Sequence, residues 1–126
     1  LRGRFKKASG VLAQSGGAVK TGRSTMKELL AMKTPPDAVF CTYDQMAIGA
    51  LHAMHESDLH APKDMAIVGF DNITVSKYIE GGLTTIENPC EDMISIAVSI
   101  LTKCTKTRRA AQQIALRPNL IVRSTT

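Results

Sequence analysis

Apolar and polar positions repeat along this chain with two different periods, and the changes between them predict its secondary structure. Some segments place apolar residues three or four positions apart, which is typical of amphipathic helices. Others are short apolar runs bounded by turn residues, which is typical of buried strands. The predicted helices cover residues 1–15, 21–33, 44–57, 75–79 and 90–103. The predicted strands cover residues 38–42, 65–70, 83–87, 114–116 and 120–122, with a turn at 61–64.

Several of these boundaries carry their own signals. Pro35 and Pro36 end the second helix, because the residue before a proline is pushed out of helical space. Asp44 is expected to cap the helix that follows the first strand. Buried strands that alternate with helices predict an α/β fold, in which helices flank a parallel sheet on both faces.

A ligand site can be predicted from this topology, because ligands of open α/β sheets bind beyond the carboxyl ends of the strands. Tyr43 and Asp44 follow the first predicted strand, Asp71 and Asn72 follow the second, and Asn88 follows the third. Parallel strands would bring all of them to one rim of the sheet. A carboxylate at such a rim can accept two hydrogen bonds from hydroxyl groups. The position of Asp71 at this rim therefore predicts a polar, hydroxylated small-molecule ligand.

Composition limits the class of protein. The chain has 126 residues, enough for one domain, and its 44% hydrophobic content can form an ordinary core. It has no apolar run close to the roughly 20 residues that cross a bilayer, so no membrane association is expected. The net charge is +5, but basic residues gather at both ends and acidic ones in the middle. With only 4% aromatic residues, no basic surface interleaved with aromatics is predicted for nucleic acid.

The candidate catalytic groups do not form a set. Asp71 as a phosphoacceptor would need further acids at the first strand to hold a metal ion, yet no aspartate precedes Asp37. Cys41 lies inside a predicted strand and is expected to be core packing. No nucleophile, base and orienting group come together, so the sequence favours a binding module over an enzyme.

No metal site, disulfide or cofactor is predicted either. Two of the three histidines lie three positions apart on a predicted helix, but no carboxylate is placed to complete a ligand set. An odd number of cysteines without a CxxC spacing argues against a zinc site or a disulfide framework, and suits the cytoplasm. The residues concerned are His52, His55, His60, Cys41, Cys90 and Cys104.

Four stretches together resemble the LacI/GalR family of bacterial transcription regulators. They are PDAVFCTYDQMAIGAL at 36–51, APKDMAIVGFDNI at 61–73, LTTI at 83–86 and LIVRS at 120–124. The chain is similar to the C-terminal part of the family's effector-binding core, which has the periplasmic-binding-protein-like (type I) fold of two α/β lobes around a ligand. The resemblance implies a repressor in which a sugar or purine-like effector bridges the lobes and allosterically controls a helix-turn-helix head on operator DNA.

The resemblance also implies roles for individual residues. Asp71 matches the family's effector-binding aspartate, and Asn88 falls near the ligand and the lobe crossover. Tyr43 stands where many members have an effector-binding asparagine, so it would stack on a ring or donate one hydrogen bond. Family dimers pack through the helix after the first motif and the short helix after the second, which nominates Ile48, Tyr78 and Ile79 as contacts of a homodimer.

The same resemblance predicts that residues 1–126 are a fragment, since no helix-turn-helix or N-terminal lobe is present and the chain starts at Leu1 without a methionine. Measuring the intact mass of the source protein tests whether residues 1–126 are a fragment. The alternative function is a periplasmic sugar-binding protein of a transporter, which shares the fold. An export signal upstream in the gene would favour that alternative, and a helix-turn-helix would favour the repressor.

Overall fold

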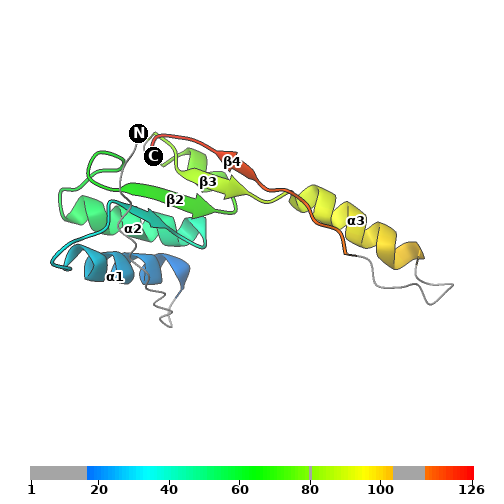
Figure 1. The fold of residues 1–126 in the computed structure, drawn as a ribbon, viewed down its shortest axis with the longest axis horizontal. Coiled ribbons are helices and arrows are strands. Elements are labelled where there is room, and N and C mark those ends of the chain that lie inside the picture. The colour runs from blue at the N-terminus through cyan, green and yellow to red at the C-terminus, as the bar shows by residue number, and fades with distance from the viewer. Residues whose placement is uncertain (1–16, 80, 104–112) are drawn as a thin grey trace.

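The computed structural model describes residues 17–79, 81–103 and 113–126, and Figure 1 shows how their elements are arranged. The predicted helix at 1–15 lies outside the described residues. In chain order the elements are α1 (Ala18–Leu30), β1 (Ala38–Phe40), α2 (Asp44–Glu56), β2 (Ala66–Phe70), the 3-10 helix η1 (Thr74–Lys77), β3 (Thr84–Glu87), α3 (Cys90–Lys103) and β4 (Asn119–Ile121).

The strands form one sheet in the order β1-β2-β3-β4. β1, β2 and β3 are parallel, which confirms the predicted α/β fold with a parallel sheet beside helices. β4 pairs with β3 in the antiparallel direction, so the sheet is mixed. The predicted strand at 114–116 is wrong: this segment is not part of the sheet. Its apolar side chains Ile114 and Leu116 instead line a hollow beside α3.

Two element boundaries differ from the predicted ones for local reasons. α1 begins three residues earlier than predicted, directly after Gly17, whose φ of 71° turns the chain into the helix. It ends at Leu30, so the chain is already out of the helix before Pro35 and Pro36. The predicted helix at 75–79 is the single 3-10 turn of η1.

The core lies between α2 and the sheet, and α1 packs against the other side of α2. The two helices approach closely at two glycines. A Cβ on Gly22 would collide with the carbonyl oxygen of Met46, and one on Gly49 would collide with that of Val19. Small residues therefore let the two backbones touch. The buried hydrophobic residues are Met26, Cys41, Ala47, Ala50, Ala53, Met54, Met65, Ile67 and Leu83.

Burial along β2 alternates, which differs from the predicted covering of both sheet faces. Ile67 and Gly69 are buried on one side, whereas Ala66, Val68 and Phe70 are half-buried. The period of two is that of a strand with one fully covered face. Among the described residues, the second face of the sheet is covered only in part.

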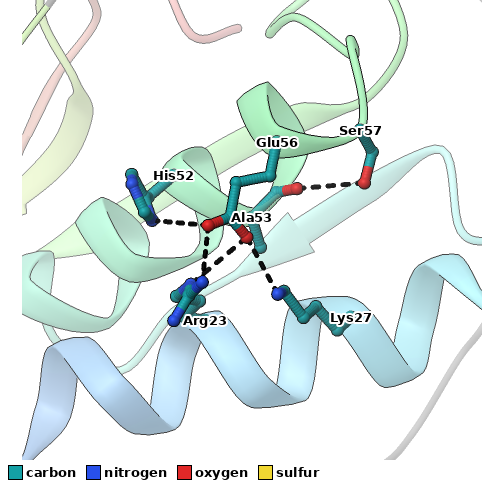
Figure 2. Close-up of polar contacts among 6 residues, drawn as sticks. All are labelled: Arg23, Lys27, His52, Ala53, Glu56 and Ser57. Atoms are coloured by element: carbon teal, nitrogen blue, oxygen red, sulfur yellow. Dashed lines mark hydrogen bonds and ion pairs between the residues drawn. The ribbon is translucent and has the colours of Figure 1, made fainter.

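A polar cluster joins α1 to α2 on the surface, as Figure 2 shows. The Arg23 guanidinium donates to both carboxylate oxygens of Glu56, at 3.2 Å and 2.5 Å. Lys27 Nζ lies 2.9 Å from Glu56 Oε2, and His52 Nδ1 lies 3.8 Å from Oε1. The hydrogen bonds from Arg23 and Lys27 lower the pKa of Glu56 from 4.5 to about 2. The carboxylate thus links α2 to α1 through Arg23 and Lys27, and its contact with His52 lies within α2.

α3 projects away from the rest of the molecule (Figure 1). It carries apolar side chains along its length, yet it has no extensive contact with any other described element. Met93, Ile94, Val98 and Leu101 are between 51% and 69% exposed. No helix in the described part of the chain is long and apolar enough to cross a membrane.

Candidate functional site

The predicted ligand rim forms at the carboxyl ends of the three parallel strands. Asp71 directly follows β2, its side chain is exposed, and its φ is 108°. Residues other than glycine rarely adopt such a positive φ, and backbone strain of this kind concentrates at functional sites. Asn72 has a φ of 49°, a left-handed conformation that asparagine tolerates. The chain therefore turns sharply here and presents the Asp71 carboxylate at the rim.

The structure brings two of the three predicted ligand residues together. Asn88, which follows β3, donates from Nδ2 to Asp71 Oδ1 at 3.1 Å. Among the described residues, no hydrogen bond joins Asp71 Oδ2 to a side chain. Tyr43 follows β1 on the same rim and is 54% exposed, but no described hydrogen bond links it to Asp71 or Asn88. The rim thus offers an amide-supported carboxylate and a separate exposed aromatic ring.

The prediction that Asp44 caps α2 is wrong. The N-cap is Tyr43, no side-chain hydrogen bond caps the helix, and Asp44 is the first helical residue. Its carboxylate is fully buried and accepts hydrogen bonds from Ser76 Oγ, Thr85 Oγ1 and, at 2.9 Å, the Ile73 amide. Tertiary donors therefore take up both oxygens, and none remains for the helix terminus.

A second polar link, which is not predicted from the sequence, holds Asn72. Arg123, just after β4, donates from Nη2 to Asn72 Oδ1 and from Nη1 to the Leu83 carbonyl oxygen, both at 2.7 Å. Asn72 Nδ2 in turn donates to Glu87 Oε1 at 2.7 Å. Residues 51 positions apart thus meet at the rim. A local pattern carries no signal for such a contact, although the similarity at 120–124 marked the segment.

Cys41 is enclosed in the fold, whereas the three histidines are exposed. Cys41 is buried, and burial, with the nearby Asp44 charge, raises the pKa of its thiol to about 11. The thiolate that a nucleophile requires is therefore scarce at neutral pH. Among the described residues, no group of three or more histidine, cysteine or acidic side chains is placed to hold a metal ion. His55 and His60 instead meet edge to face, with ring centres 6.1 Å apart.

The three residues nominated for a homodimer differ in exposure. Tyr78 is 74% exposed, and Lys77 Nζ lies 5.1 Å above its ring. Ile48 is half-buried on α2. Ile79 packs against the core and lines a hollow of about 350 Å³ with Leu51, which lies one helical turn from Ile48. Tyr78 alone is free to contact another molecule over most of its surface.

Two hollows in the described part of the chain lie beside α1. One, of about 130 Å³, lies between α1 and β1 and is lined mainly by apolar side chains, among them Met26, Leu29 and Val39. Another borders the polar cluster of Arg23 and Lys27. Asp71 lines neither of these hollows.

Comparison with known proteins gives a consistent result. Residues 5–126 match the model of the periplasmic binding protein-like domain. The transcriptional repressor PurR of Erwinia tasmaniensis is 36% identical over 113 residues, which is 89% of this chain and 33% of that protein. The probable repressor ExuR of Bacillus subtilis is 36% identical over 106 residues, 83% of this chain and 32% of that protein. The chain spans about a third of the length of these relatives.

Solved structures extend this similarity to the fold. A LacI regulator from a Bacillus cereus subspecies superposes with a TM-score of 0.81 at 25% identity, over 86% of this chain and 39% of that one. An uncharacterized protein from Actinobacillus succinogenes has a TM-score of 0.77 at 32% identity, over 85% and 39%. A LacI-family regulator from Lactobacillus casei, solved with bound sucrose, has a TM-score of 0.73 at 26% identity, over 87% and 41%.

Proposed function

This chain belongs to the family of periplasmic binding protein-like domains, and we propose that it is the C-terminal part of the effector-binding core of a LacI-type transcription repressor. In this proposal the chain binds a small molecule and catalyses nothing, and it works in the cytoplasm without a cofactor. The relatives that it matches over most of its own length are named as repressors. They are about three times longer, which leaves room for a second lobe and a DNA-binding head.

The observation that carries the proposal is the exposed Asp71 carboxylate at the carboxyl end of β2. Asn88 engages Oδ1, and the strained backbone aims the group out of the rim. A carboxylate in this setting accepts hydrogen bonds from hydroxyl or ring N–H groups, which suits a sugar or a purine-like effector. Tyr43, exposed on the same rim, would stack on a sugar or base ring.

The second lobe would face this rim and close over the effector. α3 supports this arrangement, because its exposed apolar side chains need a partner that the described residues do not supply. An effector that contacts both lobes favours one lobe arrangement by its unequal affinity for the two. In a homodimer formed partly through Ile48, Tyr78 and Ile79, that shift would change the spacing of two helix-turn-helix heads on operator DNA.

A calorimetric screen of sugars and purines against the intact protein tests this proposal. We expect a hydroxylated ligand to bind, and Asp71→Ala to weaken it about 100-fold, since charged hydrogen bonds contribute about 1.5–3 kcal/mol each. Asp37→Ala is the matched control, because Asp37 is an exposed acid at the opposite end of β1. Equal affinity of the wild-type protein and Asp71→Ala for the ligand would refute the site.

The alternative function, a periplasmic sugar-binding protein of a transporter, would use the same rim. The two differ in what precedes the core in the gene product. The intact mass and N-terminal sequence of the protein decide between them: the repressor requires a helix-turn-helix segment, and the transporter component requires an export signal. A product that begins at Leu1 would contradict both.

A further inference from the structure

A single buried carboxylate connects the three segments that build the rim. Asp44 directly follows the rim residue Tyr43, and its oxygens accept hydrogen bonds from the loop after β2, from η1 and from β3. No cation among the described residues pairs with it. Burying a carboxylate is costly unless hydrogen bonds replace its hydration, and here the donors of three segments do so. Those donors are Ile73 N–H, Ser76 Oγ and Thr85 Oγ1.

The Asp44 carboxylate lies next to the strained backbone of residues 71 and 72. Asp71 and Asn72 both have positive φ, and Ile73, the next residue, donates its amide to Asp44. Thr85 connects to the same loop a second time, since its Oγ1 accepts the Asn72 amide at 3.3 Å. Strained backbone persists only where its surroundings hold it. The hydrogen bonds around Asp44 are therefore placed to hold this turn.

The sheet leaves space for the carboxylate at one position. A Cβ on Gly69 would collide with Asp44 Oδ1. Gly69 lies in β2, two residues before Asp71. The absence of a side chain there lets the Asp44 carboxylate reach under the end of the strand and toward the loop. Glycine at position 69 thus makes room for the Asp44 carboxylate.

We propose that Asp44 is a positioning residue: it holds the turn at 71–73 so that the Asp71 carboxylate meets Asn88 and points out of the rim. Asp44 is fully buried and does not itself contact a ligand at the surface. The relevance to an effector rests on the proposed function, but the positioning of Asp71 does not. It can be measured on the 126-residue chain with no ligand present.

Amide hydrogen exchange and nitrogen-15 NMR spectra of the chain test this proposal. Asp44→Asn keeps the size of the side chain but replaces one acceptor oxygen with a donor. We expect the Ile73 amide to exchange about tenfold faster, as for the loss of one charged hydrogen bond. The Asp71 amide and Asn88 side-chain signals should shift in the same variant. The control Asp37→Asn, at an exposed acid at the opposite end of β1, should leave Ile73 exchange unchanged.

A second pair of variants keeps the test decisive if Asp44→Asn fails to fold. Thr85→Val removes one donor to Asp44, and Thr85→Ser restores the hydroxyl. We expect faster Ile73 exchange and shifted Asn88 signals in Thr85→Val, and a return to wild-type values in Thr85→Ser. Wild-type Ile73 exchange and Asn88 signals in every folded variant would overturn the proposal. A failed ligand screen would leave it standing, so the two failures are distinguishable.

Discussion

Two helices of nearly equal length, α2 with 13 residues and α3 with 14, have opposite environments in this molecule. α2 lies between α1 and the sheet, and its Ala47, Ala50, Ala53 and Met54 are at most 2% exposed. α3 carries larger apolar side chains but leaves many of them in solvent, with Leu101 at 69%. α2 is thus less apolar than α3, and yet α2 is the helix that is buried.

The difference lies in what covers each apolar face among the described residues. The buried face of α2 is mostly alanine and glycine, so α2 fits against the sheet and comes into backbone contact with α1. α3 presents isoleucine, valine, leucine and methionine, which stabilise a structure only when another surface covers them. We infer that the partner of α2 is within these residues, and that the partner of α3 is the second lobe of the proposed core.

The largest contrast is expected from truncating one apolar side chain in each helix. Met54→Ala should lower the free energy of unfolding by about 3 kcal/mol, because Met54 is 1% exposed and its removal leaves a cavity. Leu101→Ala should change it by less than about 0.5 kcal/mol in this chain. Urea denaturation followed by circular dichroism measures both. Similar losses in the two variants would contradict the contrast.

A smaller contrast is expected from adding a methyl group at the helix contact. Gly49→Ala should cost about 2 kcal/mol of unfolding free energy, since the new Cβ meets the backbone of α1 and no side chain can move away. Ser95→Ala, on the exposed surface of α3, is a surface control and should stay within about 0.5 kcal/mol. A neutral or stabilising Gly49→Ala, measured by the same denaturation, would show that α1 and α2 are not in backbone contact.

The smallest effect is expected at the polar cluster between α1 and α2. The pKa of Glu56 is lowered from 4.5 to about 2 by Arg23 and Lys27, so its charge stabilises the folded state. That contribution is complete above about pH 4.5 and disappears as the pH falls toward 2. Because the group is exposed, solvent screens it and the effect is small. The stability difference between wild type and Glu56→Gln should shrink over this pH range. A stability difference between the two proteins that stays constant from pH 7 to pH 2.5, measured by urea denaturation, would contradict this role of the Glu56 charge.

The sequence predicted the order and type of most elements. The expected helices at 44–57 and 90–103 agree with α2 and α3 to within a residue, and the strands at 38–42, 65–70 and 83–87 overlap β1, β2 and β3. Hydrophobic period is a local property, so it survives without tertiary information. The similarity of four stretches also predicted a periplasmic-binding-protein-like fold, and the family match over residues 5–126 confirms it.

What the sequence could not predict depends on contacts between distant residues. Asp44 was expected at a helix terminus because aspartate is usually exposed there, but Ser76 and Thr85, more than 30 positions away, bury it. The predicted fold has helices on both faces of the sheet, but α3 has no extensive contact with any described strand. In our proposal its partner is the second lobe, and no pattern within α3 encodes where that lobe lies.

Hydrogen exchange of α3 tests most directly whether this chain is one lobe of a larger core. The measurement compares the 126-residue chain with the intact protein, and α2 serves as the internal reference. We predict that α2 amides are protected in both, whereas α3 amides gain at least about 100-fold protection in the intact protein, because a second lobe buries the helix. Equal, low protection of α3 in both proteins would contradict the account.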